Sequence, residues 1–157
     1  EEPYSIAMVL LVHLADARRR DLRILATDLD TQALAQADAA IYPIDRIGPL
    51  ADLPWRRWVL RGRGGQEGLI RLRPEVRALV HLRQLNLIGD WQLERRYDAI
   101  FCRNVMIYFD GPTKRRLVER LAERLNEQGH LFLGHAESLI GITHRLRPVT
   151  RSVFTLA

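Results

Sequence analysis

The chain has 157 residues, 47% of them hydrophobic, which is enough for one domain with a buried core. Lysine and arginine number 24 against 19 acidic residues, and this mild excess (+5) permits an acidic partner without requiring nucleic acid. The single cysteine, Cys102, excludes an internal disulfide framework, and no apolar run reaches the roughly 18 residues of a membrane span, so we expect a cytoplasmic protein without membrane insertion.

Residues 1–5, EEPYS, have the composition of a helix start. Pro3 suits a first turn because its missing N–H needs no partner there, and acidic side chains complement the helix dipole. Apolar residues then occupy nearly all faces to about Ala17, which predicts a helix buried against a sheet. The chain starts without methionine and directly at this helix, which indicates a fragment of a longer protein.

A short strand is predicted at residues 22–27, followed by an Ala- and Leu-rich helix from Thr31 to Ala40. Asp30 or Thr31 can cap this helix. Asp28 therefore has no structural task and lies between a strand and a helix. In nucleotide-binding α/β folds an acid at this place accepts hydrogen bonds from ribose hydroxyls. The alternative is that Asp28 serves helix capping, a task that Asp30 already performs.

The middle of the chain changes character. Residues 41–53 are expected to be irregular or briefly helical. Residues 57–61 and 68–73 have the pattern of short strands. Apolar and polar residues alternate loosely over 76–86, which predicts a further strand. We therefore predict a small antiparallel β insertion at residues 55–82, with sheet edges able to accept a peptide strand. The glycines at 62–65 lack the strand-to-helix context of a phosphate loop, so a hairpin connection is expected.

Residues 98–110 begin as an apolar strand that stops at Arg103 and Asn104, continue as a second apolar run, and end at a turn and helix start. Open α/β sheets present ligand-binding groups at the carboxyl ends of their strands. We therefore expect Arg103, Asn104 and Tyr108 to face a ligand cleft. The alternative is an Arg-Asn pair at an ordinary strand end.

The last third predicts an amphipathic helix from Thr113 to Asn126, with Gly129 as its C′ residue, and then a buried strand at 130–134. Two short strands, at about 145–149 and 152–156, suggest a closing hairpin. The whole order predicts a doubly wound, Rossmann-like α/β fold. A closing antiparallel hairpin is the usual finish of class I methyltransferases rather than dehydrogenases, which is an analogy of fold alone.

Four motifs follow one another along the chain: EEPYS at 1–5, TDLD at 27–30, FCRNVMIYF at 101–109 and GHAE at 134–137. Together they resemble the CheR family, the S-adenosylmethionine-dependent methyltransferases of bacterial chemoreceptors. The resemblance covers essentially the whole chain, including the β insertion. Ala136 stands where the family often has serine. The family's first strand and its helical N-terminal domain would precede Glu1, so the expected domain at 1–54 and 83–157 lacks its first strand.

The resemblance implies S-adenosylmethionine as cofactor and S-adenosylhomocysteine as product, with no metal. By the family pattern, the acid matching Glu2 lies near the methionyl end and the acid matching Asp28 holds the ribose. The pair at 86–87 borders the adenine, and the pair at 103–104 lines the cofactor and the reaction centre. The implied cofactor-binding residues are Glu2, Asp28, Asn86, Leu87, Arg103 and Asn104.

The resemblance also implies a reaction and a partner. The family converts receptor glutamate side chains into methyl esters, and Tyr108 matches an aromatic residue near the transferring methyl group. Arg103 can steer the anionic substrate, which makes Tyr108 and Arg103 the implied catalytic residues. The expected partner is the cytoplasmic domain of a chemoreceptor, and in some members the β subdomain pairs with its C-terminal peptide.

Two other functions compete with this interpretation. A non-catalytic module of the same fold would bind the cofactor or a peptide and sense signalling state. A methyltransferase acting on RNA or a small molecule would need a basic groove or an acceptor motif, which residues 110–112 do not offer. The four motifs favour catalysis.

Overall fold

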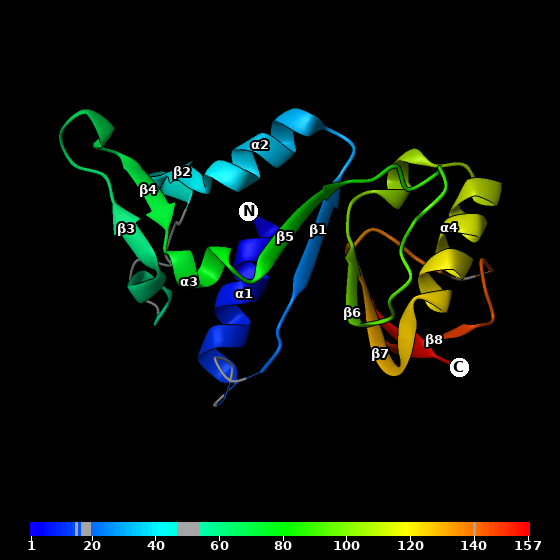
Figure 1. Cartoon of the computed structure of the whole chain (residues 1–157). Coiled ribbons are helices and arrows are strands. Elements are labelled where there is room, and N and C mark those ends of the chain that lie inside the picture. The colour runs from blue at the N-terminus through cyan, green and yellow to red at the C-terminus, as the bar shows by residue number, and fades with distance from the viewer. Residues whose placement is uncertain (15, 17–19, 47–53, 140) are drawn as a thin grey trace. The chain divides into compact units, whose positions relative to one another are not determined.

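The structure is a computed structural model that describes residues 1–14, 16, 20–46, 54–139 and 141–157. The chain forms two compact units, Glu1–Asn86 and Leu87–Ala157 (Figure 1), and each has its own hydrophobic core. Parallel strand pairs, antiparallel strands and helices confirm the predicted α/β class. None of the helices in the described part of the chain combines the length and apolarity that crossing a bilayer requires.

The first unit contains a parallel pair of strands, β1 (Ile24–Asp28) and β5 (Val80–Gln84), in register from Ile24 opposite Val80 to Asp28 opposite Gln84. The helix α2 (Thr31–Ala39) follows β1 as predicted, and the Asp30 side chain caps it by accepting a hydrogen bond from the backbone N–H of Gln32 at 2.8 Å. This arrangement confirms the strand, the cap and the helix that the sequence indicates.

The helix α1 (Glu2–His13) is shorter and less buried than expected. It ends at His13 rather than near Ala17, which lies outside the described residues. Tyr4, Ala7 and Met8 are buried in one core with residues of β1 and β5, which agrees with the predicted packing against a sheet, whereas Val9 is exposed. The Tyr4 hydroxyl donates to the backbone oxygen of Ala37 at 2.7 Å and ties α1 to the end of α2.

Two strands of the predicted β insertion, β3 and β4, form an antiparallel sheet together with β2, which lies before the predicted start of the insertion at residue 55; the order is β2-β4-β3. A turn at 62–68 joins the last two strands, which confirms the hairpin connection. The edge strand β2 corrects the expectation of irregular structure at its residues, while residues 47–53 lie outside the described part. The elements are β2 (Ile41–Pro43), η3 (Pro54–Trp58), β3 (Val59–Arg61), η4 (Gly64–Gln66) and β4 (Leu69–Leu72).

The segment 76–86 was expected to continue the antiparallel strands, and this was wrong. A short helix, α3 (Pro74–Arg77), comes first, and β5 then pairs in parallel with β1. A loosely alternating apolar pattern identifies a strand but not its partner, because pairing depends on residues distant in sequence. The division into a domain at 1–54 and 83–157 with an insertion at 55–82 stays a prediction.

The second unit is a four-stranded sheet in the order β6-β7-β9-β8, covered by one helix. β6 and β7 are parallel, and the last two strands form the predicted antiparallel hairpin (Figure 1). The apolar face of the helix is buried with residues of the sheet in one core. The elements are β6 (Tyr97–Cys102), η5 (Met106–Tyr108), α4 (Gly111–Glu123), β7 (Leu125–Leu133), β8 (Leu146–Thr150) and β9 (Val153–Leu156).

The end of α4 differs from the prediction. The helix stops at Glu123, and Gly129 lies buried within β7 rather than after a helix. A Cβ added at Gly129 would lie 2.9 Å from the backbone oxygens of both Tyr97 and Asn126. The glycine is therefore required by a close approach of backbone in the sheet, and not by a left-handed helix end.

We predict that Gly129→Ala lowers the free energy of unfolding by about 1–3 kcal/mol, because the new methyl group meets two backbone carbonyls that cannot turn aside. Gly111→Ala is the matched control, since an added Cβ there has no neighbour within 4 Å. Urea unfolding followed by circular dichroism measures both variants. Equal stability of the two would contradict the close approach.

Candidate functional site

The carboxyl edge of the parallel pair in the first unit brings two predicted site residues together. Asp28 ends β1, and its backbone oxygen accepts a hydrogen bond from the N–H of Leu85 at 3.0 Å. Asn86 is the next residue, so it follows β5 at the same edge. Both Asp28 and Asn86 are exposed. The predicted ribose and adenine contacts of this unit therefore lie where parallel sheets bind ligands.

The Asp28 carboxylate also has a local task, which corrects the expectation that it had none. Its Oδ1 accepts a hydrogen bond from the backbone N–H of Asp30 at 2.9 Å. The Gln84 side chain donates to the backbone oxygen of Leu29 at 3.0 Å and closes the same turn. A carboxylate has about four acceptor positions. One backbone bond therefore leaves Asp28 able to accept from ribose hydroxyls.

Glu2 lies in the first turn of α1 and is half-buried. Glu1 precedes the helix as its N-cap without a side-chain cap bond. The carboxylate of Glu2 is thus near helix N–H groups, where negative charge is favoured. Its predicted place at the methionyl end of the cofactor stays a prediction.

The carboxyl end of β6 carries the other predicted residues. The strand ends at the buried Cys102, and Arg103 and Asn104 follow it as exposed residues. Asn104 has φ +59°, in the left-handed region, and this bend leads into η5. Within η5, Met106 points into the core, whereas Tyr108 is 80% exposed. The predicted polar strand end is confirmed, while the roles of its residues stay predictions.

Cys102 is a core residue by its surroundings. Burial, and secondly the negative charge of Glu137, raise the pKa of its thiol to about 12. The thiol stays protonated near neutral pH, so Cys102 lacks the thiolate that nucleophilic cysteines need.

A buried carboxylate that was not among the predicted site residues holds this turn. Glu137 is 7% exposed, and its two oxygens accept hydrogen bonds from four backbone N–H groups. Oε1 accepts from Val105 at 3.0 Å and from Met106 at 2.8 Å. Oε2 accepts from Asn104 at 3.0 Å and from Gly134 at 2.7 Å. The acidic end of the GHAE motif was the available signal, but it does not reveal a partner about 30 residues earlier.

A cationic side chain holds the segment after Asn86 in a similar way. Arg120 on α4 donates to the backbone oxygens of Leu87 at 3.3 Å, Ile88 at 3.5 Å and Gly89 at 2.7 Å. Its guanidinium carbon also lies 3.9 Å from the centre of the Trp91 ring. The sequence predicted the amphipathic helix that carries Arg120, but nothing in its pattern distinguishes this residue from a solvated arginine.

The comparisons with known proteins agree with the motifs. The family described as "CheR methyltransferase, SAM binding domain" matches residues 1–154. The chain belongs to this CheR family. Its fold is accordingly that of S-adenosylmethionine-dependent methyltransferases.

Three curated relatives show what share of such proteins the chain matches. A chemotaxis protein methyltransferase 2 of Pseudomonas aeruginosa is 42% identical over all of this chain and 56% of its own length. Chemotaxis protein methyltransferases of Klebsiella aerogenes and Escherichia coli are 44% and 38% identical, over 91% and 100% of this chain and 49% and 55% of their own. The chain spans about half the length of these relatives.

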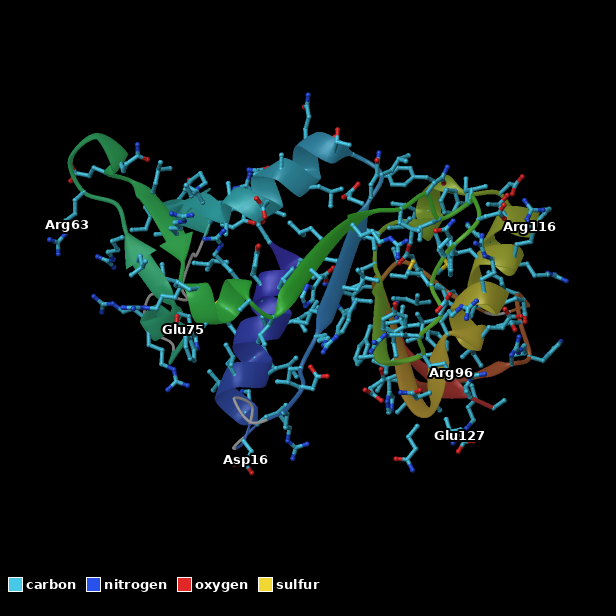
Figure 2. All side chains as sticks on the ribbon, in the orientation of Figure 1. Asp16, Arg63, Glu75, Arg96, Arg116 and Glu127 are labelled. Atoms are coloured by element: carbon cyan, nitrogen blue, oxygen red, sulfur yellow. The ribbon has the colours of Figure 1, made fainter. Side chains whose placement is uncertain are left out.

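We predict that Arg120→Met lowers the free energy of unfolding by about 1–3 kcal/mol, because charged hydrogen bonds to carbonyls and the contact with Trp91 are lost. Arg116→Met on the same helix is the control. Arg116 extends away from the ribbon (Figure 2), and its side chain donates to the Thr113 hydroxyl. Urea unfolding measures the free energy of unfolding of both variants. Equal losses of stability would contradict a stabilising role for the bonds between Arg120 and residues 87–89.

Proposed function

We propose that the full-length protein transfers a methyl group from S-adenosylmethionine to glutamate side chains of bacterial chemoreceptors, in the cytoplasm. The observation that carries the proposal is the FCRNVMIYF segment, in a chain that matches the CheR family over residues 1–154. Its strand ends in a turn that exposes Arg103, Asn104 and Tyr108. These are the residues that the family resemblance places at the reaction centre.

The chemistry of the available side chains fits the cofactor. Asp28 retains acceptor positions for ribose hydroxyls, and Asn86 lies at the same sheet edge. Leu87 supplies an apolar side chain for the adenine and packs against the core of the second unit. Glu2 supplies a carboxylate that can accept from the methionyl ammonium group. These assignments follow the family pattern, and the donor and acceptor types agree with each.

The reaction needs little acid–base catalysis by the protein. When bound, the cofactor supplies a methyl group on a positively charged sulfur; a glutamate oxygen forms the new C–O bond as the C–S bond breaks, with its electrons passing to sulfur. The substrate carboxylate is already ionised near pH 7. Arg103 attracts and orients that carboxylate. Tyr108 would place its hydroxyl oxygen and its ring beside the sulfonium, where the hydroxyl can interact with the transferring methyl group and the ring contributes a cation–π interaction of about 0.5–2 kcal/mol.

Alignment is then the main contribution of the enzyme. The carboxylate oxygen and the methyl carbon have to be held about 3–3.5 Å apart and in line with the sulfur. A turn whose backbone is bonded at successive N–H groups is a suitable support for such alignment. We propose that this turn, with Tyr108 at its end, forms the wall of the site nearest the methyl group.

The antiparallel sheet offers a place for the receptor tail. Among the described strands, β3 pairs only with β4, so its other edge can accept an added peptide strand. Arg61 on β3 and Arg63 in the following turn are exposed and favour an acidic segment. We propose that a C-terminal receptor peptide pairs with this edge, as in some members of the family.

Incubation of the full-length protein with methyl-labelled S-adenosylmethionine and a receptor cytoplasmic fragment tests the function. We expect label on the receptor that mild base releases as methanol, because glutamate methyl esters hydrolyse readily. A receptor fragment with its accepting glutamates changed to alanine is the control and should stay unlabelled. Cofactor binding without base-labile label would favour the non-catalytic module instead.

We predict that Tyr108→Phe leaves cofactor affinity within about twofold but lowers kcat by about tenfold, the effect of one lost hydrogen bond in the transition state. Tyr97→Phe, which alters a half-buried tyrosine at the start of β6, is the control. Calorimetry with S-adenosylhomocysteine and a saturating methylation assay measure the two quantities. Unchanged kcat with intact binding would contradict a role for the hydroxyl.

A further inference from the structure

We propose that Glu137 is the positioning residue of the reaction centre: its carboxylate sets the backbone of residues 103–106 and thereby places Arg103, Asn104 and Tyr108. The inference rests on the proposed function for the identity of the reaction. It concerns a residue that binds this turn through backbone N–H groups.

The geometry is that of an anion-binding nest filled by the protein's own carboxylate. The N–H groups of Asn104, Val105 and Met106 are consecutive, and all three point at one side chain within 2.8–3.0 Å. In an extended strand, consecutive N–H groups point to opposite sides and do not converge on a single group in this way. The carboxylate is therefore matched to the turn that follows β6 and to the start of η5.

The bend at Asn104 is the point at which the carboxylate acts. Its φ of +59° belongs to the left-handed region, which is uncommon for residues other than glycine and which asparagine tolerates better than most. The bond from the Asn104 N–H to Glu137 Oε2 acts at that residue, and the two following N–H groups bond to Oε1. The carboxylate thus holds the turn in the conformation that directs Tyr108 outward.

Gly134 makes room for this arrangement. A Cβ added there would lie 2.8 Å from Glu137 Oε2 and 3.1 Å from the Asn104 backbone nitrogen. The Gly134 N–H is also the fourth donor to the carboxylate, at 2.7 Å. The first and last residues of the GHAE motif therefore act together. Gly134 allows the Glu137 carboxylate and the Asn104 backbone to approach each other, and Glu137 binds the turn.

Because Glu137 is buried, the conformation of the turn depends on which side chain stands at position 137. Glutamine has almost the same size, but half of its amide is an N–H donor that would face N–H donors of the turn. Aspartate keeps the charge and both acceptor oxygens but is one methylene shorter, so it reaches fewer of the four donors. We therefore expect function to fall in the order Glu137, Glu137→Asp, Glu137→Gln.

The full-length protein and these two variants are compared for S-adenosylhomocysteine affinity and for kcat at saturating cofactor and receptor. Rates are expressed per molecule that binds cofactor, so that loss of folded protein alone does not alter them. For Glu137→Gln we expect kcat to fall by at least about tenfold and affinity to weaken about three- to tenfold, with Glu137→Asp intermediate. Glu127→Gln is the control, because Glu127 lies on β7 and extends away from the ribbon (Figure 2).

The positioning role would be overturned if Glu137→Gln kept affinity and kcat per binding molecule within about twofold of the parent, even with a lowered melting temperature. If Glu137→Gln fails to fold, parent-like values for Glu137→Asp overturn it in the same way. If the parent protein itself labels no receptor, the proposed function fails. The weakening of S-adenosylhomocysteine binding in the variants still decides the positioning role in that case.

Discussion

The hydrogen bonds between Glu137 and the turn after β6 are the constraint on which the edge of the second unit that carries Arg103, Asn104 and Tyr108 depends. A buried carboxylate is costly unless donors surround it, and the four donors here are backbone N–H groups of two strand ends. The same bonds join the end of β6 to the end of β7, its parallel neighbour. In this conformation the turn satisfies the charge with three of its N–H groups, and the side chains along it take their directions from it.

Arg120 holds backbone in the same way as Glu137 but with the opposite charge. Glu137 gathers N–H groups, whereas the guanidinium of Arg120 gathers carbonyl oxygens of residues 87–89 and lies over Trp91. Both side chains belong to regular or well-packed parts of the unit and both act on the backbone of an irregular segment. Segments that carry predicted ligand contacts are thereby held by charged groups that the ligand itself does not have to touch.

Membership in the CheR family is shown by the family match, whereas the roles of individual residues are proposed from their positions. The family matches residues 1–154, and the motifs occur in the expected order. Asp28, Arg103 and Asn104 lie at the carboxyl ends of strands as predicted, whereas the parallel pairing that brings Asn86 to the same edge as Asp28 was not predicted. Their roles toward a cofactor and a receptor remain proposals, because the chain spans about half the length of its relatives.

The sequence by itself determined the strands and helices with strong periodicity, the closing hairpin, the polar end of β6 and the family, because these depend on short-range patterns and motif order. Only the tertiary structure decided the parallel partner of β5, the place of Gly129 within β7, and the bonds of Glu137 and Arg120. Each of these joins a residue to the backbone of a segment distant in sequence. Backbone groups are the same in every residue, so no local pattern of side chains reveals which of them a distant glutamate, arginine or glycine will meet.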